Sequence, residues 1–233
     1  MENVPRLRSK RVFRDFIREL QRLGYCVDSA SLHCAKFGVP QNRRRMVLIA
    51  SLIGPVAVPC GQLSPGEYKT VRDAIGSLPA LAAGQVDSKD RLHRARHLSD
   101  TNLTRVQSSR PGGTWEDWPE SLRAKCHRKK SGATYRNVYS RMEWDRPGPT
   151  ITTLAYNFGT GRFGHPEQDR AITLREAALL QTFPRYFRFV EPKKKVSLLG
   201  VGRLIGNAVP PRLAFFIGKE IVRAAEVYSA KSE

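Results

Sequence analysis

Two arginines spaced two residues apart could bind phosphate or a carbonyl oxygen. They are Arg43 and Arg45, within the segment Gln41-Asn42-Arg43-Arg44-Arg45. Alternate residues of an extended segment face the same side, so both guanidinium groups would line one face of a cleft, with Arg44 turned toward solvent. Planar guanidinium donors suit phosphate and carbonyl acceptors. A solvated basic turn would explain a lone run of arginines equally well.

A carboxylate stands at the second position of the chain. Glu2 at the mouth of a cleft could donate or accept a proton at a ring nitrogen. To do so at neutral pH its pKa would have to be raised. A surface glutamate near a terminus is the commoner case when no neighbouring motif is considered.

The first elements that would position these groups are a helix and two strands. Residues 10–23 carry apolar residues at helical spacing, and Gly24 is placed to end the helix. Residues 25–32 predict a short strand, residues 37–45 a loop, and the apolar run 46–53 a strand buried on both faces. The expected apolar face of the helix consists of Val12, Phe13, Phe16, Ile17, Leu20 and Leu23.

The C-terminal third also has regular structure. Thr173 and Glu176 form a capping box before an apolar run, and Pro210-Pro211 predict the start of a final helix. That helix needs a core, and the 46–53 strand is its most apolar partner, so the two ends of the chain should share an α/β domain. Between them, residues 54–164 are rich in loops, with one short helix near 70–77. The final helix's expected apolar face is Leu213, Phe216, Ile217, Ile221 and Ala224.

Charge indicates a polyanionic partner. The 233 residues hold 40 Lys and Arg against 21 Asp and Glu, a net charge of +19. Most of the excess lies in residues 1–50, 121–146 and 185–203. Converging basic blocks would favour nucleic acid, and three solvated faces are the alternative. No apolar run is long enough to cross a membrane. Four scattered cysteines indicate reduced thiols in a cytosolic protein.

Four motifs in a fixed order resemble a known family. They are ENV (2–4), QNRRR (41–45), RMEWDRPGPTITT (141–153) and GNAVPPRLA (206–214). This series resembles the C-terminal portion of bacterial DNA cytosine-5 methyltransferases, and the similarity extends over essentially the whole chain. The resemblance implies an α/β fold: the C-terminal part of a Rossmann-like methyltransferase domain with an inserted, loop-rich target-recognition domain. The implied segments are catalytic (1–54), target-recognition (55–164) and a return to the catalytic domain (165–233), whose last helix lies beside the cofactor pocket.

The resemblance also implies roles for individual residues. Glu2 would contact N3 and the amino group of a flipped-out cytosine, and Asn3 would hold the adjoining turn. Arg45 would contact the base oxygen, Arg43 would serve phosphate or loop contacts, and Gln41 would be structural. The implied contacts to S-adenosylmethionine in this chain are Asn207 and Ala208, although a helix-entry turn alone explains Asn207 equally well.

Double-stranded DNA is the implied partner of the middle region. The expected DNA contacts are Arg44, Arg128, Lys129, Lys130, Arg136 and Arg141. Trp115 and Trp118 are expected to pack a small core. A zinc site built from His93, His97, Cys126 and His127 is disfavoured by the spacing, and no metal is expected. Two departures from the family are Ser140, where glycine is expected, and the basic FPRYFRF segment (183–189).

In the family that the chain resembles, the nucleophile is a cysteine in a Pro-Cys-Gln motif, and a glycine-rich motif holds the cofactor. Neither motif occurs in the 233 residues, and Cys60 is expected to be a small buried residue. We therefore expect the chain to need an N-terminal half, and to be marginal or prone to aggregation alone. The expected setting is bacterial restriction–modification, in the cytoplasm and associated with the nucleoid. The alternative is a non-catalytic, sequence-specific DNA-binding module.

Overall fold

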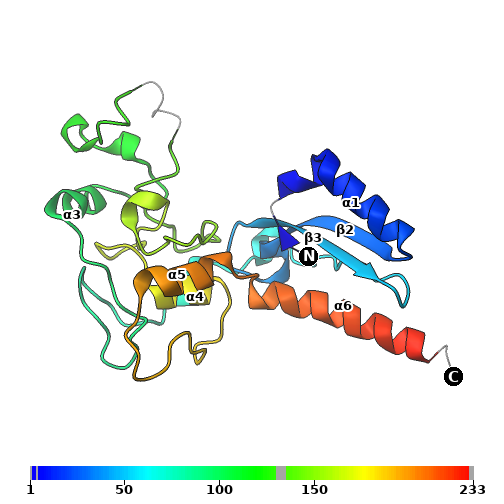
Figure 1. Cartoon of the computed structure of the whole chain (residues 1–233). Coiled ribbons are helices and arrows are strands. Elements are labelled where there is room, and N and C mark those ends of the chain that lie inside the picture. The colour runs from blue at the N-terminus through cyan, green and yellow to red at the C-terminus, as the bar shows by residue number, and fades with distance from the viewer. Residues whose placement is uncertain (1, 4, 130–134, 231–233) are drawn as a thin grey trace.

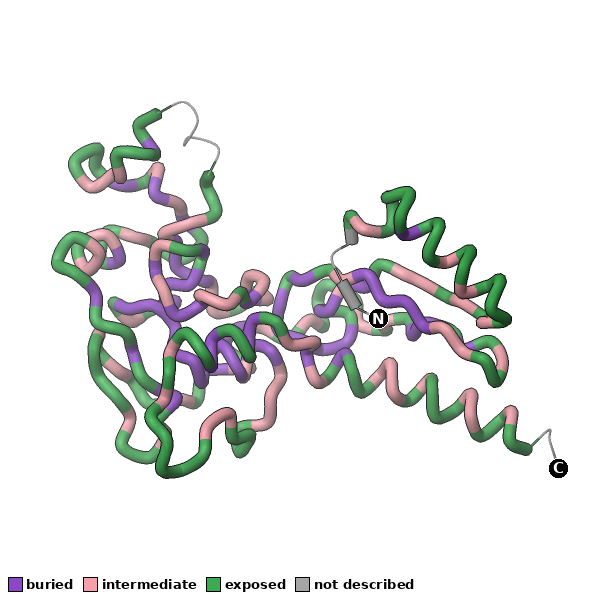
Figure 2. Tube along the Cα trace, viewed as in Figure 1, coloured by how far each residue is buried: buried purple, intermediate pink, exposed green. Residues whose placement is uncertain are grey.

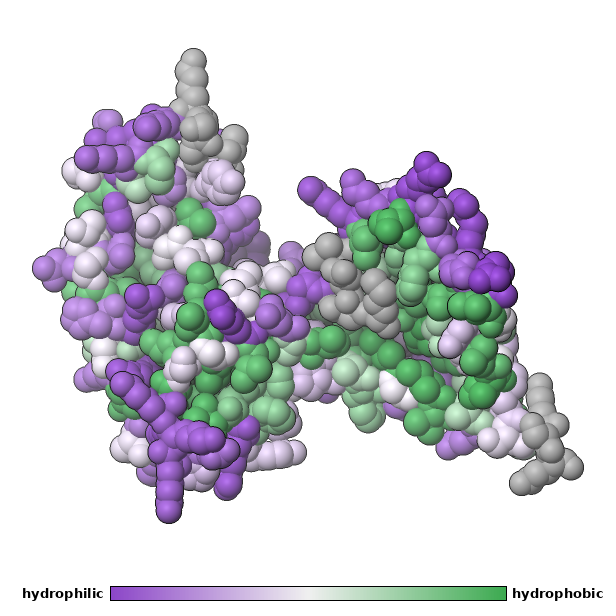
Figure 3. All heavy atoms as spheres, in the orientation of Figure 1, coloured by the Kyte–Doolittle hydropathy of each residue, from purple (hydrophilic) through white to green (hydrophobic). Residues whose placement is uncertain are grey.

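The computed structural model describes residues 2–3, 5–129 and 135–230. Figure 1 shows two bodies joined side by side, and the space-filling view of Figure 3 shows an open notch between their upper parts. One body contains the sheet and both ends of the chain, and the other contains most of the middle of the chain. Buried segments gather inside each body and along the connection between them (Figure 2).

The first body is a three-stranded sheet between two helices. The strands are β1 (Glu2–Asn3), β2 (Cys26–His33) and β3 (Arg44–Ser51). Their spatial order is β1-β3-β2, and β3 is antiparallel to both neighbours. Helices α1 (Arg11–Arg22) and α6 (Pro211–Ser229) lie on opposite sides of the sheet in Figure 1. The predicted strands and terminal helices are confirmed, with boundaries shifted by one or two residues.

Strand β3 is buried on both faces, as its apolar run predicts. Met46 and Leu48 pack with Phe13 of α1. Val47 and Ile49 pack on the other face with Leu213 of α6. Because successive side chains of a strand alternate between faces, one apolar run supplies both cores.

Helix α1 buries a narrower stripe than its sequence predicts. Phe13, Ile17 and Leu20 pack toward the sheet, whereas Val12 and Phe16 remain 67% and 43% exposed. The expectation of one fully buried apolar face is therefore wrong, because the short sheet covers only one stripe of the helix. Gly24 takes a left-handed φ of 86° directly after the helix and ends it, as expected.

Helix α6 begins at Pro211, which occupies the first helical position. Leu213 is fully buried, and Phe216, Ile217 and Ala224 pack on the same core, which confirms that the two ends of the chain share one body. Ile221 is 45% exposed, so its predicted burial is wrong. A second apolar stripe on α6 is also exposed: Phe215 is 61% and Val222 57% accessible.

The second body contains mostly short elements. Its largest core joins α2 (Val71–Ile75), α4 (Leu174–Leu180) and α5 (Leu198–Asn207) to loop residues such as Ile151 and Phe163. Helices α4 and α5 thus pack with the middle of the chain rather than on the sheet. Two short elements belong to the first body: η1 (Pro5–Ser9), which contacts α1 and β3, and η2 (Cys34–Phe37), which contacts α6. The remaining described elements are η3 (Pro65–Glu67), α3 (Asp100–Gln107), η4 (Trp115–Asp117), η5 (Glu120–Leu122) and η6 (Phe158–Thr160).

A smaller core holds both tryptophans, as expected. Trp115 and Trp118 are 3% and 2% exposed. Their ring nitrogens donate to the Tyr135 carbonyl at 2.7 Å and the Ser109 hydroxyl at 2.9 Å, so burial leaves neither polar group unpaired. Ser140 is fully buried beside this core, and its hydroxyl bonds the Gly113 carbonyl. The left-handed residue of this turn is Tyr139, with φ of 54°.

The predicted capping box opens α4 and continues into a buried polar cluster. The Thr173 amide donates to Glu176 at 2.6 Å, and the Glu176 amide donates to the Thr173 hydroxyl at 3.1 Å. Arg170 makes two 2.8 Å bonds to the Glu176 carboxylate. Burial alone would raise the pKa of Glu176, but the Arg170 guanidinium holds that pKa below its ordinary value. Burial lowers the pKa of the neighbouring His165 to about 4.

Candidate DNA-binding and base-binding site

Gln41 joins the two bodies from a fully buried position. Its amide nitrogen donates to the Leu180 carbonyl at 2.8 Å and to the Gln181 side chain at 3.0 Å. Its amide oxygen accepts from the Ile151 main chain at 2.9 Å. All three bonds reach residues more than 100 positions away, so the expected structural role of Gln41 agrees with its contacts.

Arg43 is 2% exposed and donates to two main-chain carbonyls, Ile151 at 3.0 Å and Ala208 at 3.4 Å. Of the two roles expected for it, phosphate contact is ruled out by this burial, and loop contact remains. The prediction that Arg43 and Arg45 line one open face is also wrong. Strand β3 begins only at Arg44, and the chain before it turns inward to the second body.

Arg44 and Arg45 occupy the first two positions of β3. Arg44 is exposed, as expected, and Arg45 is half-buried with a 2.8 Å bond to the Arg44 carbonyl. Because the main chain of Glu2 pairs with Val47, two residues beyond Arg45, positions 2 and 45 fall on the same face of the sheet. This register brings together two of the residues selected from the sequence, and Asn3 pairs beside them with Met46.

The glycine of the last motif permits a close approach of two main chains. A Cβ atom built on Gly206 would lie 2.3 Å from the Thr153 nitrogen and 2.4 Å from the Thr152 carbonyl carbon. The Ala208 carbonyl accepts from Arg43, so this group is already engaged within the protein. Asn207 ends α5 with an exposed side chain, which leaves its amide available to a polar group of a cofactor.

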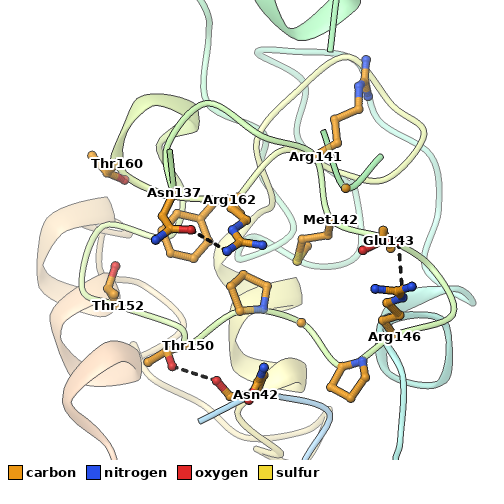
Figure 4. A pocket seen from close by; sticks show the side chains of 16 residues that line it. Asn42, Asn137, Arg141, Met142, Glu143, Arg146, Thr150, Thr152, Thr160 and Arg162 are labelled. Atoms are coloured by element: carbon orange, nitrogen blue, oxygen red, sulfur yellow. Dashed lines mark hydrogen bonds and ion pairs between the residues drawn. The ribbon is translucent and has the colours of Figure 1, made fainter. Parts of the chain in front are cut away.

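A hollow of about 490 Å³ opens where the two bodies meet, and we call it the junction hollow. Figure 4 shows Arg162 and Asn137 linked on one side of it and Glu143 and Arg146 on another. Arg162 and Arg146 are exposed at this rim. The hollow is lined by Asn42, Gly112, Asn137, Arg141, Met142, Glu143, Arg146, Pro147, Gly148, Pro149, Thr150, Thr152, Thr160, Gly161, Arg162 and Phe163.

Sequence reasoning missed both rim arginines. Each stands beside a turn, Arg146 before Pro-Gly-Pro and Arg162 within Gly-Thr-Gly-Arg-Phe-Gly. An arginine flanked by glycine or proline is the signal that could have found them, because loops carry exposed binding residues.

Arg141, by contrast, is predicted from the sequence to contact DNA, but in the structure it is a buried structural residue. It is 5% exposed and donates to four carbonyls: Val106 at 2.8 Å, Ser109 at 2.9 Å, His165 at 3.1 Å and Gln168 at 2.7 Å. It also pairs with the Asp169 carboxylate. Figure 4 shows its side chain pointing away from the hollow. The DNA-contact prediction for Arg141 is therefore wrong, because every guanidinium nitrogen is already occupied.

Three further predicted DNA contacts, Arg128, Lys129 and Arg136, lie on the surface of the second body. Arg128 and Lys129 are exposed, and Arg128 donates to the Glu120 carbonyl at 2.8 Å. Arg136 is exposed and pairs with Glu116 at 3.2 Å. Lys130 lies outside the described residues. Of these residues, the three that the structure describes do not line the junction hollow.

Comparison with known proteins decides the family. The family model for C-5 cytosine-specific DNA methylases matches residues 1–223. The chain belongs to this family. It is 51% identical over 229 residues to the type II methylase M.HgiDII of Herpetosiphon aurantiacus, covering 97% of this chain and 64% of the relative. It is 37% identical to the type II methyltransferase M1.HphI of Haemophilus parahaemolyticus, covering 96% and 56%.

Solved structures support the methylase fold. A structure described as a prophage-encoded DNA modification methyltransferase from E. coli aligns with a TM-score of 0.67 at 22% identity, covering 97% of this chain and 68% of that chain. The Dnmt2 methyltransferase of S. pombe aligns with a TM-score of 0.61 at 16% identity, covering 97% and 66%. The predicted α/β, Rossmann-like methyltransferase fold is confirmed. The chain spans about half to two thirds of the length of the curated relatives named above.

The cysteines and histidines of this methylase-family chain do not come together as a metal site. Among the described residues, no group of three His, Cys, Asp or Glu side chains could hold a metal ion. His93 bonds the Thr173 hydroxyl at 3.0 Å and the Pro79 carbonyl at 2.9 Å, and His127 stacks on Trp115. Cys60 is exposed, so the expectation that it is buried is wrong. In the described part of the chain, no helix is long and apolar enough to cross a bilayer.

Proposed function

We propose that this chain takes part in DNA cytosine-5 methylation, with double-stranded DNA as substrate and S-adenosylmethionine as methyl donor. The observation that carries the proposal is the strand register that places positions 2 and 45 on one face of the sheet. A carboxylate and a guanidinium sharing a face can bind the edge of a flipped-out pyrimidine from two sides. Family membership supports the same reaction.

In the proposed reaction each residue has a limited task. Glu2 holds the proton at N3 of the flipped cytosine and accepts from the amino group, and Arg45 donates to the base oxygen. Arg43 acts from outside this site by fixing the main chain at Ile151 and Ala208. S-adenosylmethionine, when bound, supplies the methyl group, and Asn207 holds one of its polar groups.

The duplex would run along the notch between the two bodies. Arg146 and Arg162 at the junction hollow would contact it nearest to the flipped base, and Arg44, Arg128, Lys129, Lys130 and Arg136 would add contacts further out. We propose catalytic (1–54), target-recognition (55–164) and returning catalytic (165–233) segments. Within the last, α4 and α5 pack against the recognition body, and the chain crosses back to the sheet at Asn207–Pro211.

The reaction also needs a Pro-Cys-Gln nucleophile and a glycine-rich cofactor motif. We propose that an N-terminal methyltransferase half supplies both, either in the same polypeptide or in a separate one. The exposed stripe of Phe215 and Val222 on α6 supports a covering partner. The type II methylase relatives support a role in restriction–modification. As its location we propose the bacterial cytoplasm, close to the nucleoid.

Complementation tests the proposal. The chain is combined with an N-terminal half carrying both motifs, and tritiated methyl transfer to duplex DNA is measured. Methylation should appear, and Glu2→Gln should abolish it while leaving DNA binding unchanged. Glu67→Gln makes the same chemical change at an exposed carboxylate in η3, outside β1, and as the matched control it should methylate normally. DNA binding without methylation in every combination would favour the non-catalytic DNA-binding module.

A further inference from the structure

A second hollow lies under the basic segment Phe183–Lys195, which the proposed reaction does not use. We call it the loop hollow. It has a volume of about 600 Å³, is open to solvent, and is bordered by this segment and the loop at residues 87–92. Its lining includes Lys89, Arg91, Arg175, Arg185, Tyr186 and Arg188. It shares no lining residue with the junction hollow.

The loop that forms this hollow is held in shape from both ends. Arg91 donates to the main-chain carbonyls of Pro192 and Lys194. At the other end, the rings of Phe183, Phe187 and Phe189 pack together with centroids 4.7 to 5.0 Å apart. Fixed main chain on both sides means that the basic side chains are presented on a preformed surface.

Positive charge exceeds negative charge around this hollow, whose lining includes five basic residues and the two carboxylates of Asp87 and Asp90. Segment 183–195 holds five basic residues and one acidic residue. That acidic residue, Glu191, pairs with Lys194 at 3.1 Å. The Asp87 carboxylate is engaged by the amides of Lys89 and Asp90, at 2.8 Å each. Arg185, Arg188, Lys193 and Lys195 remain exposed, so the surface attracts anions.

One buried guanidinium at the hollow is incompletely satisfied. Arg175 is 6% exposed, and its Nε and Nη2 atoms donate to Asp90. Its Nη1 atom is buried and has no hydrogen-bond partner among the described residues. An unpaired buried donor costs free energy that an anionic acceptor would recover. Burial alone would raise the pKa of Asp90, but the bond from Arg175 keeps that pKa below its ordinary value, so Asp90 stays a carboxylate.

An aromatic ring stands among these cations. Tyr186 is 85% exposed between Arg185 and Arg188, and Phe187 beside it is 40% exposed. Exposed rings interleaved with arginines are typical of nucleic-acid surfaces, where the rings contact sugars or bases and the guanidiniums contact phosphates. An acidic protein surface would use the cations but would leave the exposed ring without a specific task.

We propose that the loop hollow binds the phosphate backbone of a second DNA segment, separate from the duplex in the notch. Figure 1 shows the loop between α4 and α5 at the lower edge of the second body, on the side away from the notch. Hydrophilic side chains gather on this lower edge in Figure 3. One chain would thereby hold two DNA segments at once. The inference rests on the proposed DNA substrate and adds a second binding surface to it.

A bridging assay tests the proposal with the full 233-residue chain. One duplex is immobilised and saturated with protein, and capture of a second, fluorescent duplex is measured. The wild type should capture it. Arg185→Gln/Arg188→Gln should reduce capture about tenfold while changing affinity for the first duplex by less than about twofold. The control Lys219→Gln/Arg223→Gln removes the same charge from α6 and should capture normally.

The possible failures can be told apart. A chain that binds no duplex at all contradicts the proposed function. A chain that binds one duplex but captures no second one overturns the second-segment proposal alone, as does normal capture by Arg185→Gln/Arg188→Gln. Release of the second duplex by free inorganic phosphate, but not by sodium chloride of equal ionic strength, would reassign the hollow to a small phosphate ligand. It would likewise overturn the proposal.

Discussion

The guanidinium of Arg43 donates to the main-chain carbonyl of Ala208 across 165 residues of sequence. The same side chain donates to the Ile151 carbonyl, so three separate motifs meet at one buried cation. This contact ties the start of β3 to the crossing between α5 and α6. The relative placement of the sheet body and the junction hollow therefore depends on Arg43.

Removing this cation should be costly. Arg43→Met leaves the buried carbonyl of Ile151 and the partly buried carbonyl of Ala208 without their donor, and we expect the free energy of unfolding to fall by about 2–4 kcal/mol. The exposed neighbour Arg44 provides the control, since Arg44→Met should change the free energy of unfolding by less than about 0.5 kcal/mol. Urea denaturation followed by tryptophan fluorescence measures both. Equal effects of the two substitutions would contradict the structural role of Arg43.

Substituting Arg162 should weaken DNA binding, whereas substituting Arg141 should lower the stability of the fold. Arg162→Ala removes an exposed cation of the junction hollow and should weaken duplex binding about five- to tenfold, with unchanged stability. The salt dependence of duplex binding by this variant should also decrease, by an amount that corresponds to about one released counterion. Arg141→Ala should instead destabilise the fold by about 3 kcal/mol or more, because it leaves several buried carbonyls unpaired. Fluorescence anisotropy measures the affinity of both variants for duplex DNA, and urea denaturation measures their free energy of unfolding. A stable Arg141→Ala with weakened binding would restore the DNA role.

Replacing two helical glycines by alanine should change the free energy of unfolding in opposite directions. Gly206→Ala places a methyl group against the main chain of Thr152 and Thr153 and should lower stability by about 1–3 kcal/mol. Gly218 in α6 has no atom within 4 Å of an added Cβ, so Gly218→Ala should raise stability by about 0.5–1 kcal/mol. Thermal melts of both variants at one protein concentration provide the comparison. An unchanged melting temperature for Gly206→Ala would show that the main chain at Gly206 and the main chain at Thr152 and Thr153 can move apart at no cost in stability.

His165 should make stability depend on pH. Its pKa is lowered by burial from 6.5 to about 4, so below 6.5 the unfolded chain binds a proton that the folded chain does not. The free energy of unfolding therefore falls as the pH drops through this window. From about pH 7.5 to about pH 5 the loss from this group is about 2 kcal/mol. His33 and His127, whose pKa values burial also lowers, act in the same direction.

A substitution isolates the contribution of His165. Its Nδ1 atom accepts from the amides of Glu167 at 3.2 Å and Gln168 at 2.9 Å. An asparagine oxygen can occupy the same position, so His165→Asn keeps an acceptor but cannot titrate. The difference between the wild-type and variant losses over this pH range should be about 2 kcal/mol. An identical pH dependence of urea midpoints in the two proteins would refute the assignment.

The elements of the sheet body could be predicted because their signals are local. The Gly24 stop, the Thr173–Glu176 capping box and Pro211 at the start of α6 depend on neighbours within a few residues. The apolar run of β3 predicted burial on both faces. How much of α1 and α6 is covered could not be predicted, because it depends on how wide the packed sheet is. Val12 and Ile221 were assigned to buried faces and are exposed for this reason.

The sequence by itself determined the family, the order of the main elements of the sheet body and the basic character, since motif order, local signals and net charge need no folded geometry. Only the tertiary structure decided which arginines are free to bind. Arg43 and Arg141 have the same side chain as Arg162, yet the first two are buried and donate to main-chain carbonyls brought from distant segments. A guanidinium binds whichever acceptor the packed chain presents to it. The chain path around each arginine therefore decides between a structural contact and a DNA contact.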